Sequence, residues 1–164
     1  MQDGFFHDFL LIALAVMLAV AAFTDARQRR IDNWLNLAIV IGAPLFWWTS
    51  GLELWPGVAI QLGMATATLV VFASLFAFGA MGGGDVKLLT AIALWLEPTW
   101  FLRMLLIMAL LGGLLTIILG AWHLTRRQKH KLAIPYGVAI AAAGIWILEM
   151  RYFSTGAASA SGLG

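Results

Sequence analysis

Six apolar runs, separated by short polar or glycine-containing intervals, account for most of the chain. They span residues 5–23, 34–48, 56–78, 86–96, 100–122 and 132–150. A helix needs about 20 apolar residues to cross a hydrocarbon core of about 30 Å, and most of the runs approach that length. We therefore expect an all-α integral membrane protein, a bundle of about six transmembrane helices forming one domain over residues 1–153. Residues 154–164 are small and polar, which predicts a disordered tail.

The fourth run is short, since about 11 residues form a helix of only roughly 16 Å, about half of the hydrocarbon thickness. It follows the segment 79–87, which reads Gly-Ala-Met-Gly-Gly-Gly-Asp-Val-Lys. The outer end of the helix sits in thinned bilayer, or the glycine segment dips into the membrane and starts the helix at depth. We favour the dip, because Asp85 would itself recruit water there. An acid at membrane depth is costly, and therefore marks a candidate functional site.

Charge and composition narrow the function classes. Hydrophobic residues make up 62% of the chain and mean hydropathy is +0.92, which excludes an ordinary soluble domain. Cysteine is absent, which excludes a thiol nucleophile and a cysteine-ligated zinc site. The basic residues fall in alternate intervals, so we interpret them as topology signals and expect no nucleic-acid partner. By the positive-inside rule, the intervals that hold most of the basic residues face the cytoplasm. Their basic residues are Arg27, Arg29, Arg30, Lys87, Arg126, Arg127, Lys129 and Lys131.

With these basic intervals on the cytoplasmic side, both termini lie on the outer side of the membrane. It also puts five tryptophans beside the outer loops, where an aromatic belt is expected. They are Trp47, Trp48, Trp55, Trp95 and Trp100. Glycines in the fifth and sixth runs, Gly112, Gly113, Gly137 and Gly144 among them, indicate close helix packing.

Only three carboxylates belong to the predicted cytoplasmic side: Asp25, Asp32 and Asp85. Asp25 follows the first run and Asp85 begins the fourth, so the two lie at one membrane level on different helices. Such a pair can hydrolyse a peptide bond, one carboxylate taking a proton from water while the other donates to the scissile carbonyl. Each also has a plainer interpretation: Asp25 ends a helix, and Asp85 caps one after glycines. The pairing, with the glycine break and the short helix, favours the dyad.

Helix dipoles suggest how the charge is shared between the two carboxyls. A helix C-terminus disfavours an anion and an N-terminus favours one. We therefore expect Asp85 to be the ionised base and Asp25 the protonated partner. Lys87 is either a topology charge or a contact for a substrate carboxylate.

Three segments resemble the type IV prepilin peptidase family, in the family's order. Gly82-Gly83-Gly84-Asp85 matches the GxGD motif of membrane aspartyl proteases, and residues 82–88 resemble the longer GxGDxKL segment. Residues 24–33 resemble the first-aspartate segment, in which basic residues and Ile-Pro-Asn follow the aspartate; here Asp32 replaces the proline. Residues 134–140 resemble the Ile-Pro-Tyr/Phe-Gly segment. The cysteine-bearing insert of longer members is missing, so the chain resembles a short form.

The resemblance implies that Asp25 and Asp85 are the catalytic pair. We further expect Gly82, Gly83 and Gly84 to let a substrate backbone and a water come close to Asp85, and Lys87 is a candidate substrate contact. The substrate would be a prepilin or pseudopilin in the bacterial inner membrane, losing a short cytoplasmic leader ahead of its apolar helix. Proteolysis would require no metal or other cofactor. S-adenosylmethionine would be needed only if the methylation seen in longer members were retained, and no segment here indicates a site for it.

Two alternatives stay open. A presenilin-like GxGD protease would cut inside a helix, although such proteins are larger and carry their first aspartate within a helix. A small transporter or assembly factor would instead use Asp25 and Asp85 as a proton or cation site.

Overall fold

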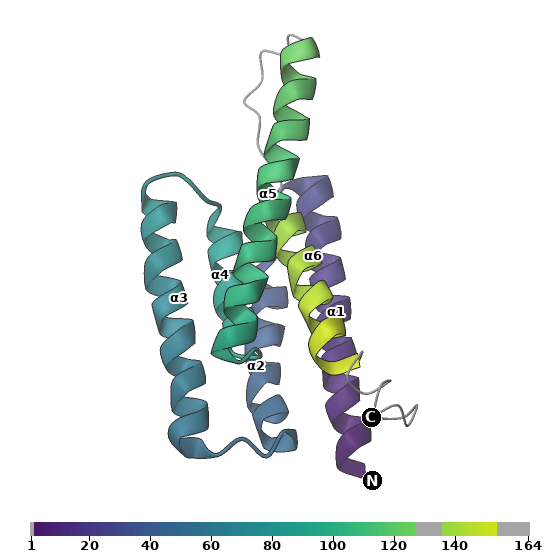
Figure 1. Ribbon diagram of the computed structural model, residues 1–164, viewed down its shortest axis with the longest axis vertical. Helices are drawn as coiled ribbons and strands as arrows, with labels where there is room; N and C mark the ends of the chain where they lie inside the picture. The colour runs from purple at the N-terminus through teal and green to yellow at the C-terminus, as the bar shows by residue number, and fades with distance from the viewer. Residues whose placement is uncertain (1, 127–135, 154–164) are drawn as a thin grey trace.

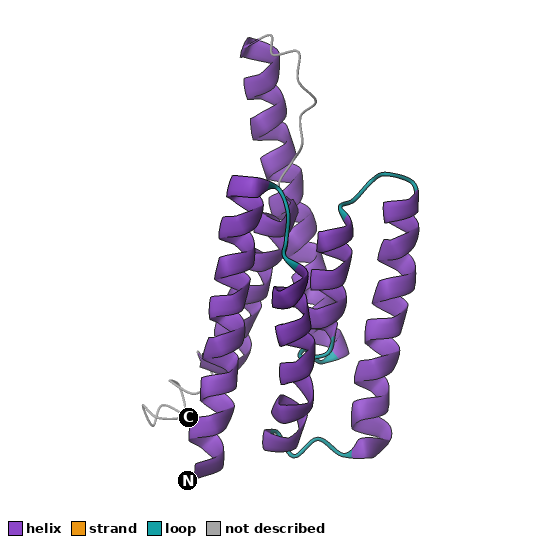
Figure 2. Ribbon diagram, turned by 180° about the vertical axis from the view of Figure 1, so that it is seen from behind, coloured by secondary structure: helices purple, strands orange, loops and turns teal. Residues whose placement is uncertain are grey.

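The computed structural model describes residues 2–126 and 136–153, and within them every regular element is helical (Figures 1 and 2). The elements are α1 (Gln2–Gln28), α2 (Asn33–Thr49), η1 (Leu54–Val58), α3 (Ala59–Ala77), α4 (Gly83–Ala93), α5 (Pro98–Arg126), α6 (Tyr136–Leu148) and η2 (Glu149–Phe153). The η2 element is a single π-helical turn after α6, whereas η1, before α3, is interrupted at Trp55, whose φ of −133° and ψ of 126° are extended. The tail predicted for residues 154–164 lies outside the described residues.

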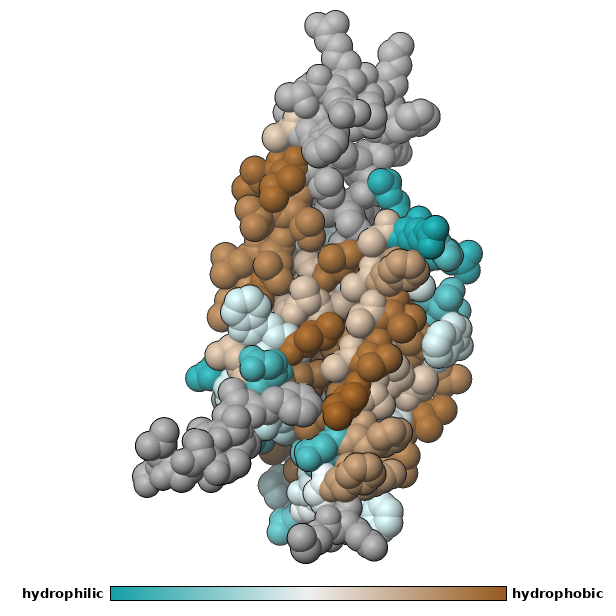
Figure 3. All heavy atoms as spheres, turned by 90° about the vertical axis from the view of Figure 1, so that its right-hand side faces the viewer, coloured by the Kyte–Doolittle hydropathy of each residue, from teal (hydrophilic) through white to brown (hydrophobic). Residues whose placement is uncertain are grey.

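Three stretches of the described helices are long and apolar enough to cross a membrane. They are Gly4–Gln28, Leu54–Ala77 and Pro98–Ile118. Figure 3 shows apolar side chains over the middle of one face, with hydrophilic ones gathered nearer the ends. The molecule is therefore a membrane protein, and its number of crossings stays a prediction.

Two helices extend further into basic sequence than predicted. The α1 helix continues to Gln28 rather than ending near residue 23, and α5 continues to Arg126 rather than 122. Arginine and glutamine are good helix formers, and cations favour a helix C-terminus, so the polar residues prolong these helices. As a result Asp25 lies in the last turn of α1. The rest of the predicted basic loop, and the start of the sixth run at residue 132, lie outside the described residues.

The short fourth helix is the centre of the bundle. It begins three residues earlier than predicted, at Gly83, and packs against α2, α3 and α6. Its buried side chains include those of Leu88, Leu89 and Ile92. In Figures 1 and 2 the connection from α3 descends to α4, which starts below the end of α3. The irregular residues ahead of α4 are mostly exposed: Met81 is half-buried, whereas Gly79, Ala80 and Gly82 are exposed.

A polar side chain satisfies the backbone carbonyl groups at the C-terminal end of α4. With its amide oriented to satisfy both groups, Gln61 of α3 donates to the carbonyl oxygens of Ala93 and Leu96 at 2.9 Å. Pro98 then occupies the first position of α5, where its missing N–H costs nothing. These contacts let α4 end inside the bundle.

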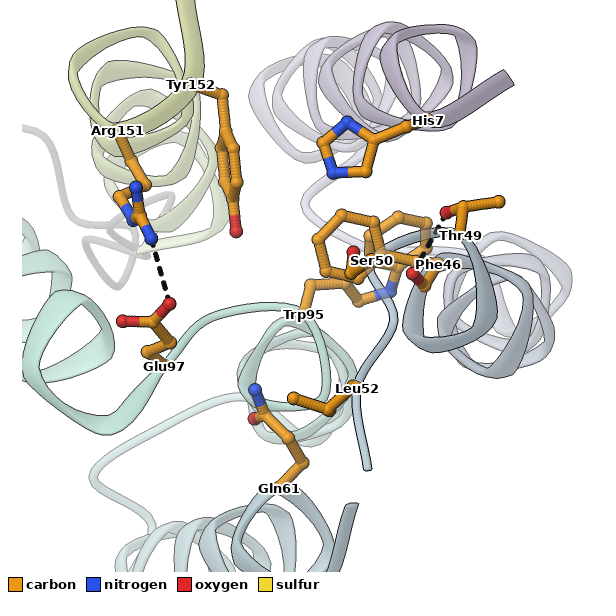
Figure 4. A pocket seen from close by; sticks show the side chains of 10 residues that line it. All are labelled: His7, Phe46, Thr49, Ser50, Leu52, Gln61, Trp95, Glu97, Arg151 and Tyr152. Atoms are coloured by element: carbon orange, nitrogen blue, oxygen red, sulfur yellow. Dashed lines mark hydrogen bonds and ion pairs between the residues drawn. The ribbon is translucent and has the colours of Figure 1, made fainter. Parts of the chain in front are cut away.

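The prediction that Trp95 belongs to an interfacial belt is wrong. Its side chain is buried, its indole nitrogen donates to the Ile39 carbonyl at 2.9 Å, and its ring stacks on Phe46 with centroids 5.0 Å apart (Figure 4). The reason is the short α4, whose C-terminal end does not reach the molecular surface. Trp48 and Trp55 are exposed, as an interfacial belt requires.

The pocket in Figure 4 lies at the end of the bundle away from the two aspartates. It has a volume of about 330 Å³ and is bordered by His7 and by the ion pair between Glu97 and Arg151, with 2.9 Å between nitrogen and oxygen. His7 and Asp25 are 18 residues apart on α1, roughly 27 Å along the helix. This pocket is therefore separate from the candidate active site.

Replacing Trp95 by phenylalanine is expected to lower the free energy of unfolding by about 1–3 kcal/mol, because it removes a buried hydrogen bond and leaves a void. Thermal unfolding in detergent measures the effect. The matched control is Trp48→Phe, which makes the same change at an exposed position and should alter stability little. Equal effects of the two substitutions would contradict the assignment of Trp95 to the core.

Candidate active site

Asp25 lies in the last turn of α1 with its side chain only 6% exposed. Its Oδ2 accepts a hydrogen bond from the backbone N–H of Val138, at 3.2 Å, in the first turn of α6. A Cβ placed on Gly137 would lie 2.7 Å from the same oxygen, closer than real Cβ atoms come. The start of α6 therefore packs directly on the carboxyl, and a side chain at position 137 would displace Asp25 or Ile31.

Asp85 is the third residue of α4, and its side chain is 8% exposed. The N-cap position that the plainer interpretation gave to Asp85 is occupied by Gly82, whose φ of −76° and ψ of 142° are extended. A Cβ on Gly82 would lie 2.9 Å from Oδ2 of Asp85. The carboxyl thus folds back over the beginning of its own helix, where the dipole favours a negative charge.

Ile31 links the surroundings of the two carboxyls. The connection from α1 to α2 turns at Arg29, which has a φ of 54°, and Ile31 is then buried. A Cβ on Gly84 would lie 3.2 Å from the Ile31 Cβ, and one on Gly137 would lie 2.9 Å from the Ile31 Cδ1. One apolar side chain therefore contacts both α4 and α6 beside the aspartates.

The two carboxyls themselves are close enough for their charges to interact. Asp25 and Asp85 are 60 residues apart in sequence and lie on different helices. The structure thus brings together the pair on which the dyad hypothesis depends. Their helices run in opposite directions along the bundle, so the end of α1 meets the beginning of α4 (Figure 1).

The three glycines ahead of Asp85 have different neighbours. A Cβ on Gly83 would lie 3.3 Å from the Phe76 ring of α3, and Gly84 faces Ile31. These two glycines let α4 approach other parts of the protein closely. Only Gly82, which is exposed, lies beside the Asp85 carboxyl itself. We therefore expect Gly82, rather than all three glycines, to provide backbone access for a substrate beside Asp85.

Lys87 and Asp32 lie near the pair but have other neighbours. The Lys87 ammonium donates to the Asn33 Oδ1 at 2.9 Å, a contact that the sequence did not indicate. Asp32 takes the N-cap position of α2, but its side chain makes no capping hydrogen bond.

The sequence did not indicate that the start of α6 contacts Asp25. Asp25 lies at the C-terminal end of α1, which disfavours an anion, but also at the N-terminal end of α6, which favours one. The expectation that Asp25 is protonated took account of the C-terminal end of α1 but not of the N-terminal end of α6. Gly137 was interpreted as a packing glycine, although its place in the Ile-Pro-Tyr-Gly segment could have connected it with the aspartates. Gly112 and Gly144 do pack closely on neighbouring helices, whereas Gly113 faces open space.

Two neighbouring carboxyls suit acid–base chemistry on water. No group of three or more histidine, cysteine, aspartate or glutamate side chains gathers to hold a metal ion in the described residues. One carboxylate can accept a proton from water while the other carboxyl donates one to a carbonyl oxygen.

Comparison with known proteins gives one match. The model of the type IV leader peptidase family matches residues 12–117, well over half of the chain. The matched region contains Asp25, the glycine segment and Asp85, whereas residues 134–140 lie beyond it. No curated protein and no solved structure matches the chain. With this coverage, the chain belongs to the type IV leader peptidase family.

Proposed function

We propose that this protein is an aspartic endopeptidase that removes the short cytoplasmic leader of prepilins or pseudopilins. The observation that carries the proposal is the pair of buried, interacting carboxyls of Asp25 and Asp85, held on separate helices at one end of the bundle. Membership of a leader peptidase family supports peptide hydrolysis as the reaction.

Hydrolysis then proceeds without a covalent enzyme intermediate. The ionised carboxylate removes a proton from water, whose oxygen attacks the scissile carbonyl, while the protonated carboxyl donates its proton to the carbonyl oxygen. The C–N bond of the tetrahedral intermediate breaks, the amine leaves with a proton from the dyad, and the leader departs with a new carboxyl terminus. Asp85 lies at the N-terminal end of α4, and Asp25 lies between the C-terminal end of α1 and the N-terminal end of α6, so the proposal does not assign the charge to one of them.

The charge distribution supports a cytoplasmic position for the active site. Arg27, Lys87 and Arg126 lie on α1, α4 and α5 toward the same end as the two aspartates, whereas Arg151 lies at the other. By the positive-inside rule the aspartates face the cytoplasm across the bacterial inner membrane, and all six helices are embedded. Both termini are then on the outer side.

Two further parts of the proposal concern partners. Lys87, two residues from Asp85, is available to contact the substrate near the cut, exchanging its bond to Asn33 for one to the substrate. Membrane lipids surround the bundle. Proteolysis by the dyad uses no cofactor, and S-adenosylmethionine enters only if the new N-terminus is also methylated.

The test is a cleavage assay with the purified full chain in lipid nanodiscs and a panel of prepilins. We expect one cut just ahead of the apolar helix, identified by mass spectrometry of the product N-terminus. The same spectrum, with and without S-adenosylmethionine, reports any methyl group. Absence of cleavage, together with proton flux through the protein in liposomes, would instead support the transporter alternative.

A further inference from the structure

A groove opens on the outside of the bundle between α2 and α3. Both helices pack on α4 rather than forming a substantial interface with each other, and α4 forms the floor. The groove has a volume of about 390 Å³ and is lined mainly by apolar side chains, including those of Leu37, Val40 and Leu69. Asn33 and Lys87 lie at one end of it.

The groove contains a polar group that lacks a partner. Asn36 is among the residues that line the groove and is 5% exposed; its Nδ2 and Oδ1 are both buried, and neither has a hydrogen-bond partner within the described residues. Burying an unpaired amide is costly, and more so where lipid replaces water. An occupant that relieves this cost must offer both a hydrogen-bond acceptor and a donor.

This requirement distinguishes the candidate occupants. A lipid acyl chain fills apolar space but offers Asn36 nothing to bond. A peptide chain entering its first helical turn still carries unpaired backbone N–H groups, with carbonyl groups just ahead of them. The remaining turns of an apolar helix would contact the aliphatic side chains of the groove.

The position of the groove agrees with such an occupant. Its polar end includes Lys87, in the same first turns of α4 as Asp85, and Asn33, which is two residues after Ile31, the side chain that lies beside Gly84 and Gly137. Lys87 and Asp85 are two residues apart and project from different faces of α4, so a chain leaving the groove at that end would pass around the start of α4 to reach the aspartates. Cleavage would fall just ahead of the apolar helix.

We propose that the groove between α2 and α3 holds the apolar helix of the substrate, and that the Asn36 side chain turns into the groove so that its amide bonds the backbone where that helix begins. The inference rests on the proposed leader peptidase function and adds to it a binding surface and a positioning residue. It applies to membrane-embedded peptide substrates as a class.

The first experiment is photo-crosslinking in nanodiscs with a prepilin and the inactive Asp85→Asn protein. A benzophenone amino acid replaces Leu37 in the groove or, as a control, Leu106 on α5; the two side chains are 58% and 66% exposed. We expect the substrate to crosslink several-fold more at position 37. Equal yields, or crosslinks from position 37 chiefly to lipid or to a second copy of the chain, would overturn the proposal.

The second experiment uses Asn36→Leu, which keeps the side-chain size and removes the unpaired amide. We expect the KM for prepilin to rise roughly tenfold while kcat changes less than about twofold, as for a lost hydrogen bond in substrate binding. The melting temperature without substrate should rise, because the unpaired group is gone. A lower melting temperature with unchanged KM would show a purely structural role and overturn the assignment of Asn36.

These outcomes separate the two proposals. If the unmodified protein cleaves prepilins but the groove variants behave like their controls, the groove inference fails and the leader peptidase function stands. If the unmodified protein cleaves no prepilin, both fail.

Discussion

Asparagine in place of either Asp25 or Asp85 is expected to lower kcat for leader cleavage by roughly 10²–10⁴-fold, the usual contribution of general acid–base catalysis. The amide has the shape of the carboxyl but can neither take a proton from water nor supply one to the scissile carbonyl. Because the two groups act as one unit, the double variant should lose little more activity than either single variant. Prepilin cleavage by each purified variant, followed by mass spectrometry, measures the loss.

Asp32→Asn is the matched control for this pair. Asp32 lies in the connection between α1 and α2, near the same end of the bundle, and its side chain makes no capping hydrogen bond. The same chemical change at this position should leave cleavage close to that of the unmodified protein. Full activity in both Asp25→Asn and Asp85→Asn would refute the dyad.

Gly137→Ala is expected to reduce kcat by about 10²-fold, because a displacement of about 1 Å can cost that much. The new Cβ would lie 2.7 Å from Oδ2 of Asp25 and 2.9 Å from the Ile31 Cδ1, so the carboxyl or the start of α6 must move. Either movement weakens the hydrogen bond from Val138 and changes the approach of Asp25 to Asp85. Steady-state kinetics with a prepilin substrate, alongside thermal unfolding, measure the two consequences separately.

Two other glycine-to-alanine changes serve as controls. At Gly113 nothing lies within 4 Å of the new Cβ, so activity should be retained. At Gly144 the Cβ would lie 2.9 Å from the Leu18 Cδ1, in packing remote from the carboxyls, so stability should fall more than activity. If Gly144→Ala reduces cleavage as much as Gly137→Ala, general loosening of α6 rather than displacement of Asp25 would explain the effect.

The sequence predicted the helical bundle well, because local composition determines where apolar helices form. It also predicted the short fourth helix and the end of the bundle to which Asp25 and Asp85 belong. Its errors concern residues whose surroundings come from distant segments. Trp95 looked like an interfacial tryptophan until α4 proved too short to bring it to the surface.

The candidate site, like the fold, has some features that local sequence predicts and others that depend on distant segments. The two aspartates and the glycines before Asp85 are recognisable by residue type, order and position between apolar runs. The contacts that hold them are not: the N–H of Val138 on Asp25 joins residues 113 apart in sequence. No local pattern indicates that contact, nor the side chain of Ile31 between α4 and α6.

By itself, the sequence determined that this is a helical membrane protein with an acid at the end of its first apolar run and another after a glycine segment. It did so because hydropathy and backbone freedom are properties of neighbouring residues. Only the tertiary structure decided that α6 begins on Asp25, that two of the three glycines ahead of Asp85 pack closely on other segments, and that Asn36, with a buried and unpaired amide, lines a groove between α2 and α3. These features depend on which helices meet, and in a bundle of similar apolar helices the pairing is decided by close packing across the whole molecule.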